Sequence, residues 1–118
     1  MRITEVDFGT GTPIDGYGTG FFRVGGKVVN GGALILPGSV AAWDGYDATA
    51  PILAAADAID ILILGTGGEI AHPPQAFRKA LEAAGIGVEP MASPAACRTY
   101  NVLLSEGRRV GAAVLPLG

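Results

Sequence analysis

Short apolar runs separated by glycines make up the first part of the chain, a pattern typical of β-strands joined by tight turns. Residues 3–8 alternate apolar and polar side chains, as the residues of a half-buried strand do. Residues 20–24 and 27–29 flank Gly25-Gly26, and a Gly-Gly pair supplies the positive φ angles of a two-residue turn. We therefore expect a β-hairpin here, followed by a strand over 33–36.

From about residue 49 the pattern changes to helices that alternate with strands. The apolar run at 59–64, interrupted only by Asp60, is typical of a strand buried on both faces of a parallel sheet. Ser93-Pro94 is a strong helix start, because serine caps a helix and proline suits its first position. The expected elements are a helix over 51–56 capped by Thr49, a strand over 59–64, a helix over 74–84, a strand over 86–89, a helix over 93–106 and a strand over 110–115.

This alternation predicts an α/β fold. Strand–helix–strand–helix–strand units with short connections form right-handed crossovers, so the C-terminal half should build a parallel or mixed sheet with helices packed on it. The N-terminal strands must then extend that sheet or form a second layer. Trp43, between the Pro37-Gly38 stop and the Asp44-Gly45 turn, is expected to anchor the core. A length of 118 residues suits a single domain over 1–118.

Composition and charge narrow the classes of protein. Hydrophobic residues make up 49% of the chain and charged residues 16%, a balance that argues against disorder. A net charge of -3 offers no broad basic surface, so nucleic acid is not an expected partner. Cys97 is the only cysteine and His72 the only histidine, which excludes an internal disulfide and a plausible zinc site. We expect no cofactor.

The location of the protein is also constrained. Its apolar runs are far shorter than the roughly 20 residues that span a bilayer, so no transmembrane segment is expected. The first residues, MRITEVDFGTG, are charged and lack the apolar run of a signal peptide. We expect a soluble, cytoplasmic bacterial protein, or a mitochondrial matrix protein only if the chain is a mature organellar form.

A glycine loop, Gly65-Thr66-Gly67-Gly68, follows the central apolar strand. It departs from the dinucleotide-binding fingerprint, because Ile70 stands at the third glycine position and the next helix begins only near Pro74. A phosphate loop of the GxxxxGK[ST] type is also excluded, because no lysine follows. Two interpretations stay open: a tight turn for close packing, or a small anion-binding nest of backbone N–H groups.

A pocket is expected between this loop and the helix that begins at Ser93. Two adjacent helix N-termini and the cation Arg98 would favour a small anion there. The alternative is that Arg98 points to solvent. The candidate pocket residues are Gly65, Thr66, Gly67, Gly68, His72, Ser93, Arg98 and Asn101.

Two further side chains have competing interpretations. His72 either joins a site or covers a helix N-terminus, and with Cys97 it could form a nucleophile–base pair. Cys97, however, shares a helical stripe with Tyr100 and Leu104, which favours a buried structural thiol. On the opposite stripe lie Arg98, Asn101 and Ser105, either as a solvated face or as a partner contact.

The segment MASPAACRTYNVLLSEGRR, residues 91–109, closely resembles the signature of a family of small domains of unknown function that includes the mitochondrial respiratory complex I assembly factor 3. The resemblance implies a three-layer α/β fold whose sheet is flanked by helices and additional β-structure. It also implies an assembly role at a membrane complex, and it brings no catalytic residues. Other matching segments are 20–24, 31–34, Pro37, Trp43 and 61–67.

We therefore expect a non-enzymatic interaction or assembly domain that assists biogenesis of respiratory complex I or another membrane complex and binds protein partners. The residues support this mainly by exclusion, because they offer no complete nucleophile–base–orienter set, metal constellation or intact cofactor loop. The alternative is a protein or enzyme that binds a small anion or nucleotide at the loop from Gly65 to His72.

Overall fold

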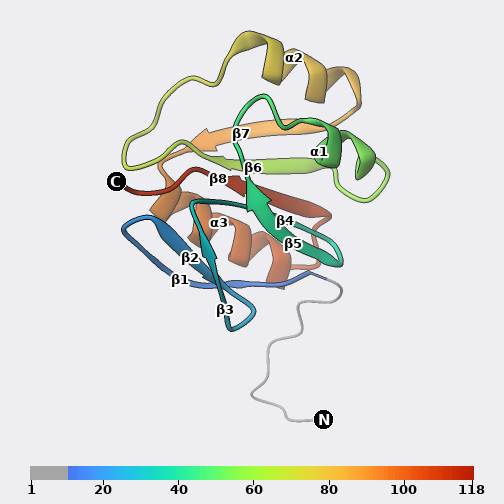
Figure 1. The fold of residues 1–118 in the computed structure, drawn as a ribbon. Helices are drawn as coiled ribbons and strands as arrows, with labels where there is room; N and C mark the ends of the chain where they lie inside the picture. The colour runs from blue at the N-terminus through green and yellow to red at the C-terminus, as the bar shows by residue number, and fades with distance from the viewer. Residues whose placement is uncertain (1–10) are drawn as a thin grey trace, which may run out of the picture.

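The computed structural model describes residues 11–118, which form eight strands and three helices (Figure 1). The expected strand over 3–8 lies outside these residues. Gly25 and Gly26 both have positive φ, 58° and 81°, and join the expected hairpin. In chain order the elements are β1 (Ile14–Gly18), β2 (Phe21–Val24), β3 (Lys27–Asn30), β4 (Gly32–Leu36), β5 (Ser39–Trp43), α1 (Ala50–Ala54), β6 (Ile61–Gly65), α2 (Gln75–Ala83), β7 (Gly87–Met91), α3 (Ser93–Ser105) and β8 (Val110–Val114).

The strands form two sheets. The larger has five strands in the order β5-β4-β8-β6-β7, and the smaller has three in the order β1-β2-β3. Strands β7, β6 and β8 run parallel to one another through the α2 and α3 crossovers, whereas β4 pairs antiparallel with both β8 and β5. The mixed central sheet with a βαβαβ C-terminal half is therefore confirmed.

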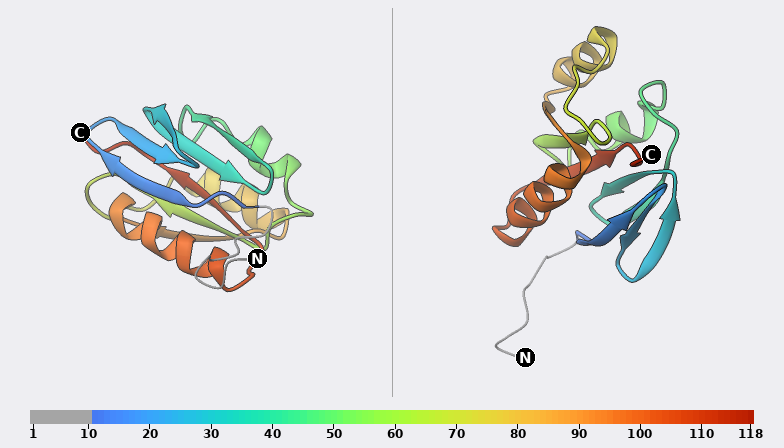
Figure 2. Two further views of the ribbon diagram at one scale, coloured as in Figure 1. Left: turned by 90° about the horizontal axis from the view of Figure 1, so that it is seen from below. Right: turned by 90° about the vertical axis from the view of Figure 1, so that its left-hand side faces the viewer.

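Three layers follow from the alternation of side chains along the strands of the large sheet. Leu62 and Leu64 point to the face covered by α1 and α2, whereas Ile63 points to the opposite face. That opposite face is covered by α3 and by the small sheet, side by side (Figure 2). Large side chains fill both interfaces: Phe77, Leu81 and Trp43 on the first side, and Phe22, Tyr100 and Leu104 on the second. Trp43 is buried, as expected.

Two strands have no counterpart in the sequence-based expectation. Strand β1 contains two glycines and an aspartate in five residues, a composition that disfavours a strand. Strand β5 carries small residues and is exposed along Ser39–Ala42, so it lacks the alternation that marks a half-buried strand. Both form because neighbouring strands hold them: β2 pairs with β1, and β4 pairs with β5.

Neither Thr49 nor Ser93 caps its helix through its side chain, contrary to expectation. Thr49 precedes α1 in a helical conformation and makes no side-chain capping bond. Its carbonyl accepts the Leu53 N–H at 3.0 Å instead. Ser93 is the first residue of α3 rather than its cap, and Ala92 takes the capping position without a side-chain bond. The Ser93 hydroxyl is free for another contact, which shapes the turn after β6.

Candidate functional site

The turn after β6 is built around the fully buried Ser93 side chain. Its Oγ accepts the Gly67 N–H at 3.0 Å and donates to the Leu115 carbonyl at 2.7 Å. The Ser93 N–H donates to the Gly67 carbonyl at 2.7 Å. A single hydroxyl therefore ties together the loop after β6, the first turn of α3 and the segment after β8.

Gly65 makes this close approach possible. A Cβ at position 65 would lie 2.6 Å from Ser93 Oγ and 2.8 Å from Val114 Cγ1, closer than real side-chain atoms pack. Any larger residue would push α3 away from the sheet or displace the serine. The packing interpretation of the loop therefore has a direct structural basis at Gly65.

Thr66 closes the loop on itself. Its Oγ1 lies 2.6 Å from the Glu69 carbonyl oxygen and accepts the Ala71 N–H at 3.0 Å. The Thr66 N–H donates to the Met91 carbonyl at 2.9 Å. Together with the Gly67 N–H bound to Ser93, three backbone donors of the loop already have acceptors within the fold. An anion in this loop must use other donors or displace these bonds.

Gly65 to Gly68 and Ser93 lie together, but the other candidate pocket residues differ in placement. His72 and Arg98 are both exposed. Asn101 is half-buried, and its side chain bonds both backbone groups of Ile14, with Oδ1 accepting the N–H at 2.9 Å and Nδ2 donating to the carbonyl at 2.8 Å. Asn101 is therefore not simply part of a solvated face, because its amide attaches β1 to α3.

The buried face of α3 holds Cys97 and Tyr100. Cys97 is 4% exposed, which confirms the buried thiol, and burial raises its pKa to about 11. A thiol with such a pKa is protonated at neutral pH and is a poor nucleophile. Burial also raises the pKa of Tyr100, whose hydroxyl donates to the Thr12 carbonyl at 2.9 Å. Cys97 is buried and His72 is exposed, so their burial does not support a nucleophile–base pair.

Within residues 11–118, no three His, Cys, Asp or Glu side chains are grouped so that they could hold a metal ion. None of the helices in this range is long and apolar enough to cross a membrane.

A second surface feature is a groove between the hairpin and the edge of the large sheet. Its volume is about 620 Å³. Val28 is 53% exposed and Val40 37% exposed, both high values for large apolar side chains. The sequence did not reveal this groove, because β5 was not expected as a strand. The groove is lined by Thr12, Val24, Gly25, Lys27, Val28, Val29, Asn30, Val40, Ala41 and Ala42.

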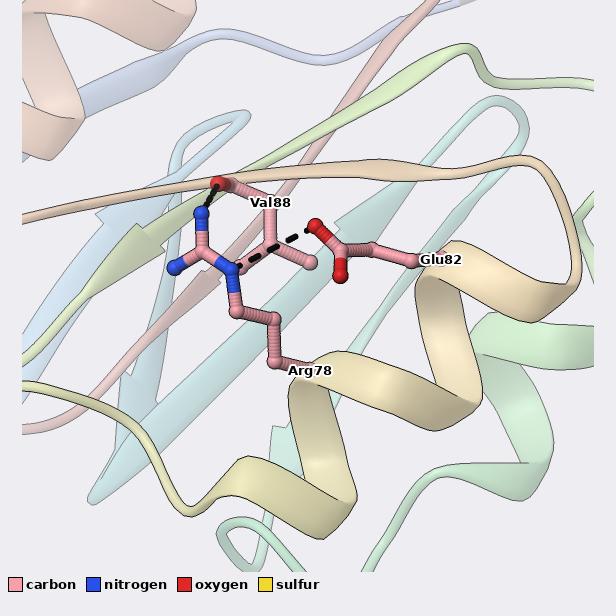
Figure 3. Close-up of polar contacts among 3 residues, drawn as sticks. All are labelled: Arg78, Glu82 and Val88. Atoms are coloured by element: carbon pink, nitrogen blue, oxygen red, sulfur yellow. Dashed lines mark hydrogen bonds and ion pairs between the residues drawn. The ribbon is translucent and has the colours of Figure 1, made fainter.

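The opposite edge of the large sheet, strand β7, is covered. Arg78 of α2 donates from Nη2 to the Val88 carbonyl at 3.2 Å, and its Nε lies 3.4 Å from Glu82 Oε2 (Figure 3). The Gly87 N–H and the Met91 carbonyl bond inward, to Asp60 and Thr66. Because strand residues alternate in direction, Val88 and Pro90 face outward, and Pro90 has no N–H to offer.

The protein is thus a three-layer α/β domain. The polar groups of the turn after β6 bond to neighbouring groups of the same domain, on β7, on α3 and after β8. The chain belongs to the family described as protein of unknown function DUF498/DUF598, whose model matches residues 14–115. This confirms the resemblance inferred from residues 91–109.

Relatives of known sequence and structure share this domain. An uncharacterised protein of Rhodobacter capsulatus is 50% identical, covering 99% of this chain and 94% of its own. The human NADH dehydrogenase [ubiquinone] 1 alpha subcomplex assembly factor 3 is 33% identical over 87% of this chain, which spans 60% of the human protein. The crystal structure of an outer membrane protein from Bartonella henselae is similar with a TM-score of 0.84 and 32% identity, covering 91% of this chain and 96% of that one.

Proposed function

We propose that this domain is a non-enzymatic interaction domain that assists assembly of a respiratory or other membrane complex by binding a protein partner. The observation that supports the proposal is the similarity to the human assembly factor over 87% of this chain. The structure adds physical support. In the glycine loop after β6, the Thr66 hydroxyl and the Gly67 N–H bond to groups of the same domain, and the Ser93 hydroxyl links the loop to the segment after β8.

Deletion of the gene in its own bacterium tests the proposal. Membranes of the deletion strain should contain less fully assembled NADH:ubiquinone oxidoreductase, or another respiratory complex, on native gels, and partly assembled species should accumulate. A plasmid copy of the gene should restore the intact complex. Unchanged levels of every respiratory complex in the deletion strain would contradict an assembly role. Fractionation of the same cells would test the expected cytoplasmic location.

A small-anion site at the loop is the alternative proposal. Its support is that Gly67 meets Ser93 at the start of α3, while His72, in the loop after β6, and Arg98, on α3, are both exposed. Titration of phosphate, nucleotides and carboxylates into ¹⁵N-labelled protein, with a neutral sugar as control, would test it. Saturable shifts of the Gly67 and Ala95 amides that disappear in Arg98→Gln would support this site. Absence of such shifts leaves the loop with a structural role.

A further inference from the structure

The groove between β3 and β5 is bordered by two strand edges whose backbone groups point into it. Leu36 and Ser39 pair across the two-residue turn Pro37-Gly38. In such a hairpin the pair next to the turn exchanges hydrogen bonds and every second pair does likewise, so Ala41 also bonds to β4. Val40 and Ala42 then direct their N–H and carbonyl groups away from β4.

Strand β3 follows the same rule. Val24 and Lys27 pair across the turn Gly25-Gly26, so the outward residues of β3 are Val28 and Asn30. Val28, Asn30, Val40 and Ala42 all line the groove. Two free strand edges, from two different sheets, therefore border one cavity.

These edges have no partner among the described residues. Strands β3 and β5 each end their sheet, and within residues 11–118 no further backbone bond reaches Lys27–Val29 or Ser39–Ala42. Proteins usually protect a free edge with a charge, a proline or a bulge. The stretch Ser39–Ala42 contains none of these.

The lining of the groove defines what would fit. Unpaired backbone donors and acceptors match the main chain of an extended strand, which binds by adding to a sheet edge. The valine and alanine side chains match apolar residues at alternate positions of that strand. Among the described residues that line the groove, Lys27 is the only one with an ionisable side chain, so a carboxylate near this end of the strand is complementary in charge.

We propose that an extended segment of a partner protein, apolar at alternate positions and with an acidic residue near Lys27, binds in this groove and adds to β5 as a sixth strand of the large sheet. The proposal rests on the proposed function, because it names the surface through which the domain would hold a partner. The turn Gly65–His72 has no part in it.

Selection of short random peptides on the full-length protein, followed by binding assays with the selected peptides, tests this proposal. Selected peptides should alternate β-branched residues with others and carry an acidic residue, and they should shift the amides of Val40 and Ala42. Val40→Pro removes the outward N–H and should weaken binding at least about tenfold, the effect of losing roughly one hydrogen bond. Val40→Thr keeps the shape and the N–H and should bind within about twofold.

Val28→Glu gives a second test that leaves β5 unchanged. It replaces an apolar contact on the opposite wall by a negative charge that repels the acidic residue of the peptide, so it should also weaken binding. Failure to select any peptide, or binding of both Val40→Pro and Val28→Glu with wild-type affinity, would overturn the proposal. So would a wild-type dimer that Val40→Pro dissociates, because the occupant would then be a second copy. Binding seen only after removal of residues 1–10 would assign the groove to the chain's own N-terminus and would also overturn it.

The deletion strain separates this proposal from the proposed function. If the strain has an assembly defect and Val40→Pro and Val28→Glu both restore assembly, the groove proposal fails while the assembly role stands. If the deletion has no effect on respiratory complexes, the assembly role fails while peptide binding still decides the groove. Loss of complementation by both variants, but not by Val40→Thr, would support both.

Discussion

The large sheet ends in β7 on one side and in β5 on the other, and the two edges differ in what lies beside them. At β7, Arg78 binds the outward carbonyl of Val88, and Pro90 stands where an outward N–H would otherwise be. At β5, the outward groups of Val40 and Ala42 face a cavity of about 620 Å³. A free edge can pair with a strand of another chain, so the difference indicates which side of the sheet is available to a partner.

The turn after β6 resembles the β7 edge rather than the β5 edge, because backbone groups of the turn have hydrogen-bond partners within the domain. Its backbone donors bond to Ser93, to Thr66 and to Met91, all within the domain. Three backbone donors of the glycine loop are therefore bonded within the domain, whereas β5, which was not expected from the sequence, has an open edge.

Proline substitutions at adjacent positions of β5 test which backbone groups face the groove. Ala41→Pro removes an N–H that bonds to β4 and leaves a buried carbonyl without a donor, so it should lower the free energy of unfolding by about 3 kcal/mol. Val40→Pro removes only an outward N–H and should cost less than about 1 kcal/mol. Urea denaturation of both variants measures the contrast. Equal costs would show that the outward assignment of Val40 is wrong.

Ser93→Ala tests the covered turn. It leaves the Gly67 N–H and the Leu115 carbonyl without their partner in a partly buried place, and should cost about 2 kcal/mol of stability. Ser105→Ala is the matched control on the same helix, because Ser105 is exposed, and it should change stability by less than about 0.5 kcal/mol. A similar cost for both variants would argue against a structural role for the Ser93 hydroxyl.

Alkaline pH tests the interior next to the covered turn, because Cys97 lies on α3 one turn beyond Ser93. The folded protein raises the pKa of this thiol from 9.0 to about 11, so folding favours the protonated form. The resulting stability is fully present below pH 9 and is lost as pH rises toward 11, by about 2 kcal/mol near pH 10.5. Denaturation curves across this range measure it.

Cys97→Ala is the control for the alkaline experiment. Its stability should fall less steeply between about pH 9 and 11, with a residual slope from Tyr100, whose pKa burial raises above 10.0. An equal slope in both proteins would show that Cys97 does not titrate differently in the folded and unfolded states. Thiol reagents should also react slowly with the native protein.

Arg78→Ala tests the cover over β7. The guanidinium is partly solvent-exposed, so loss of its bond to the Val88 carbonyl should cost only about 1 kcal/mol. Lys79→Ala on the same helix should be neutral by comparison. The double variant Arg78→Ala, Pro90→Val tests whether these two residues keep β7 from pairing with another strand. It frees the Val88 carbonyl and adds an outward N–H at position 90, so self-association should increase, measured by sedimentation. An oligomeric state that is the same as that of the wild type, even at high concentration, would show that these residues do not keep β7 from pairing.

Some features could be read from the residues alone because they depend on local chemistry. Gly25-Gly26 requires a tight turn wherever it occurs, and the apolar run at 61–64 requires burial on both faces. The stripe of Cys97 and Tyr100 likewise predicted the buried face of α3. These predictions needed no knowledge of which element lies opposite.

Other features depended on partners far away in the chain. Ser93 suggested a helix cap, and Asn101 suggested a polar surface, yet each side chain bonds to backbone more than 20 residues away. Strand β1 exists because Asn101 and β2 supply its hydrogen bonds, and nothing in its own composition favours it. The candidate site was therefore predicted in part: Gly65 and Ser93 do meet, but as packing partners.

The sequence by itself determined the α/β class, the order of most helices and strands and the positions of the tight turns, because backbone preferences and hydrophobic periods act over a few residues. Only the tertiary structure decided that the small sheet lies beside α3, that Arg78 covers β7, and that β3 and β5 leave a groove between them. The physical reason is that an edge is open or covered according to what packs next to it, and in this protein those neighbours come from distant parts of the chain.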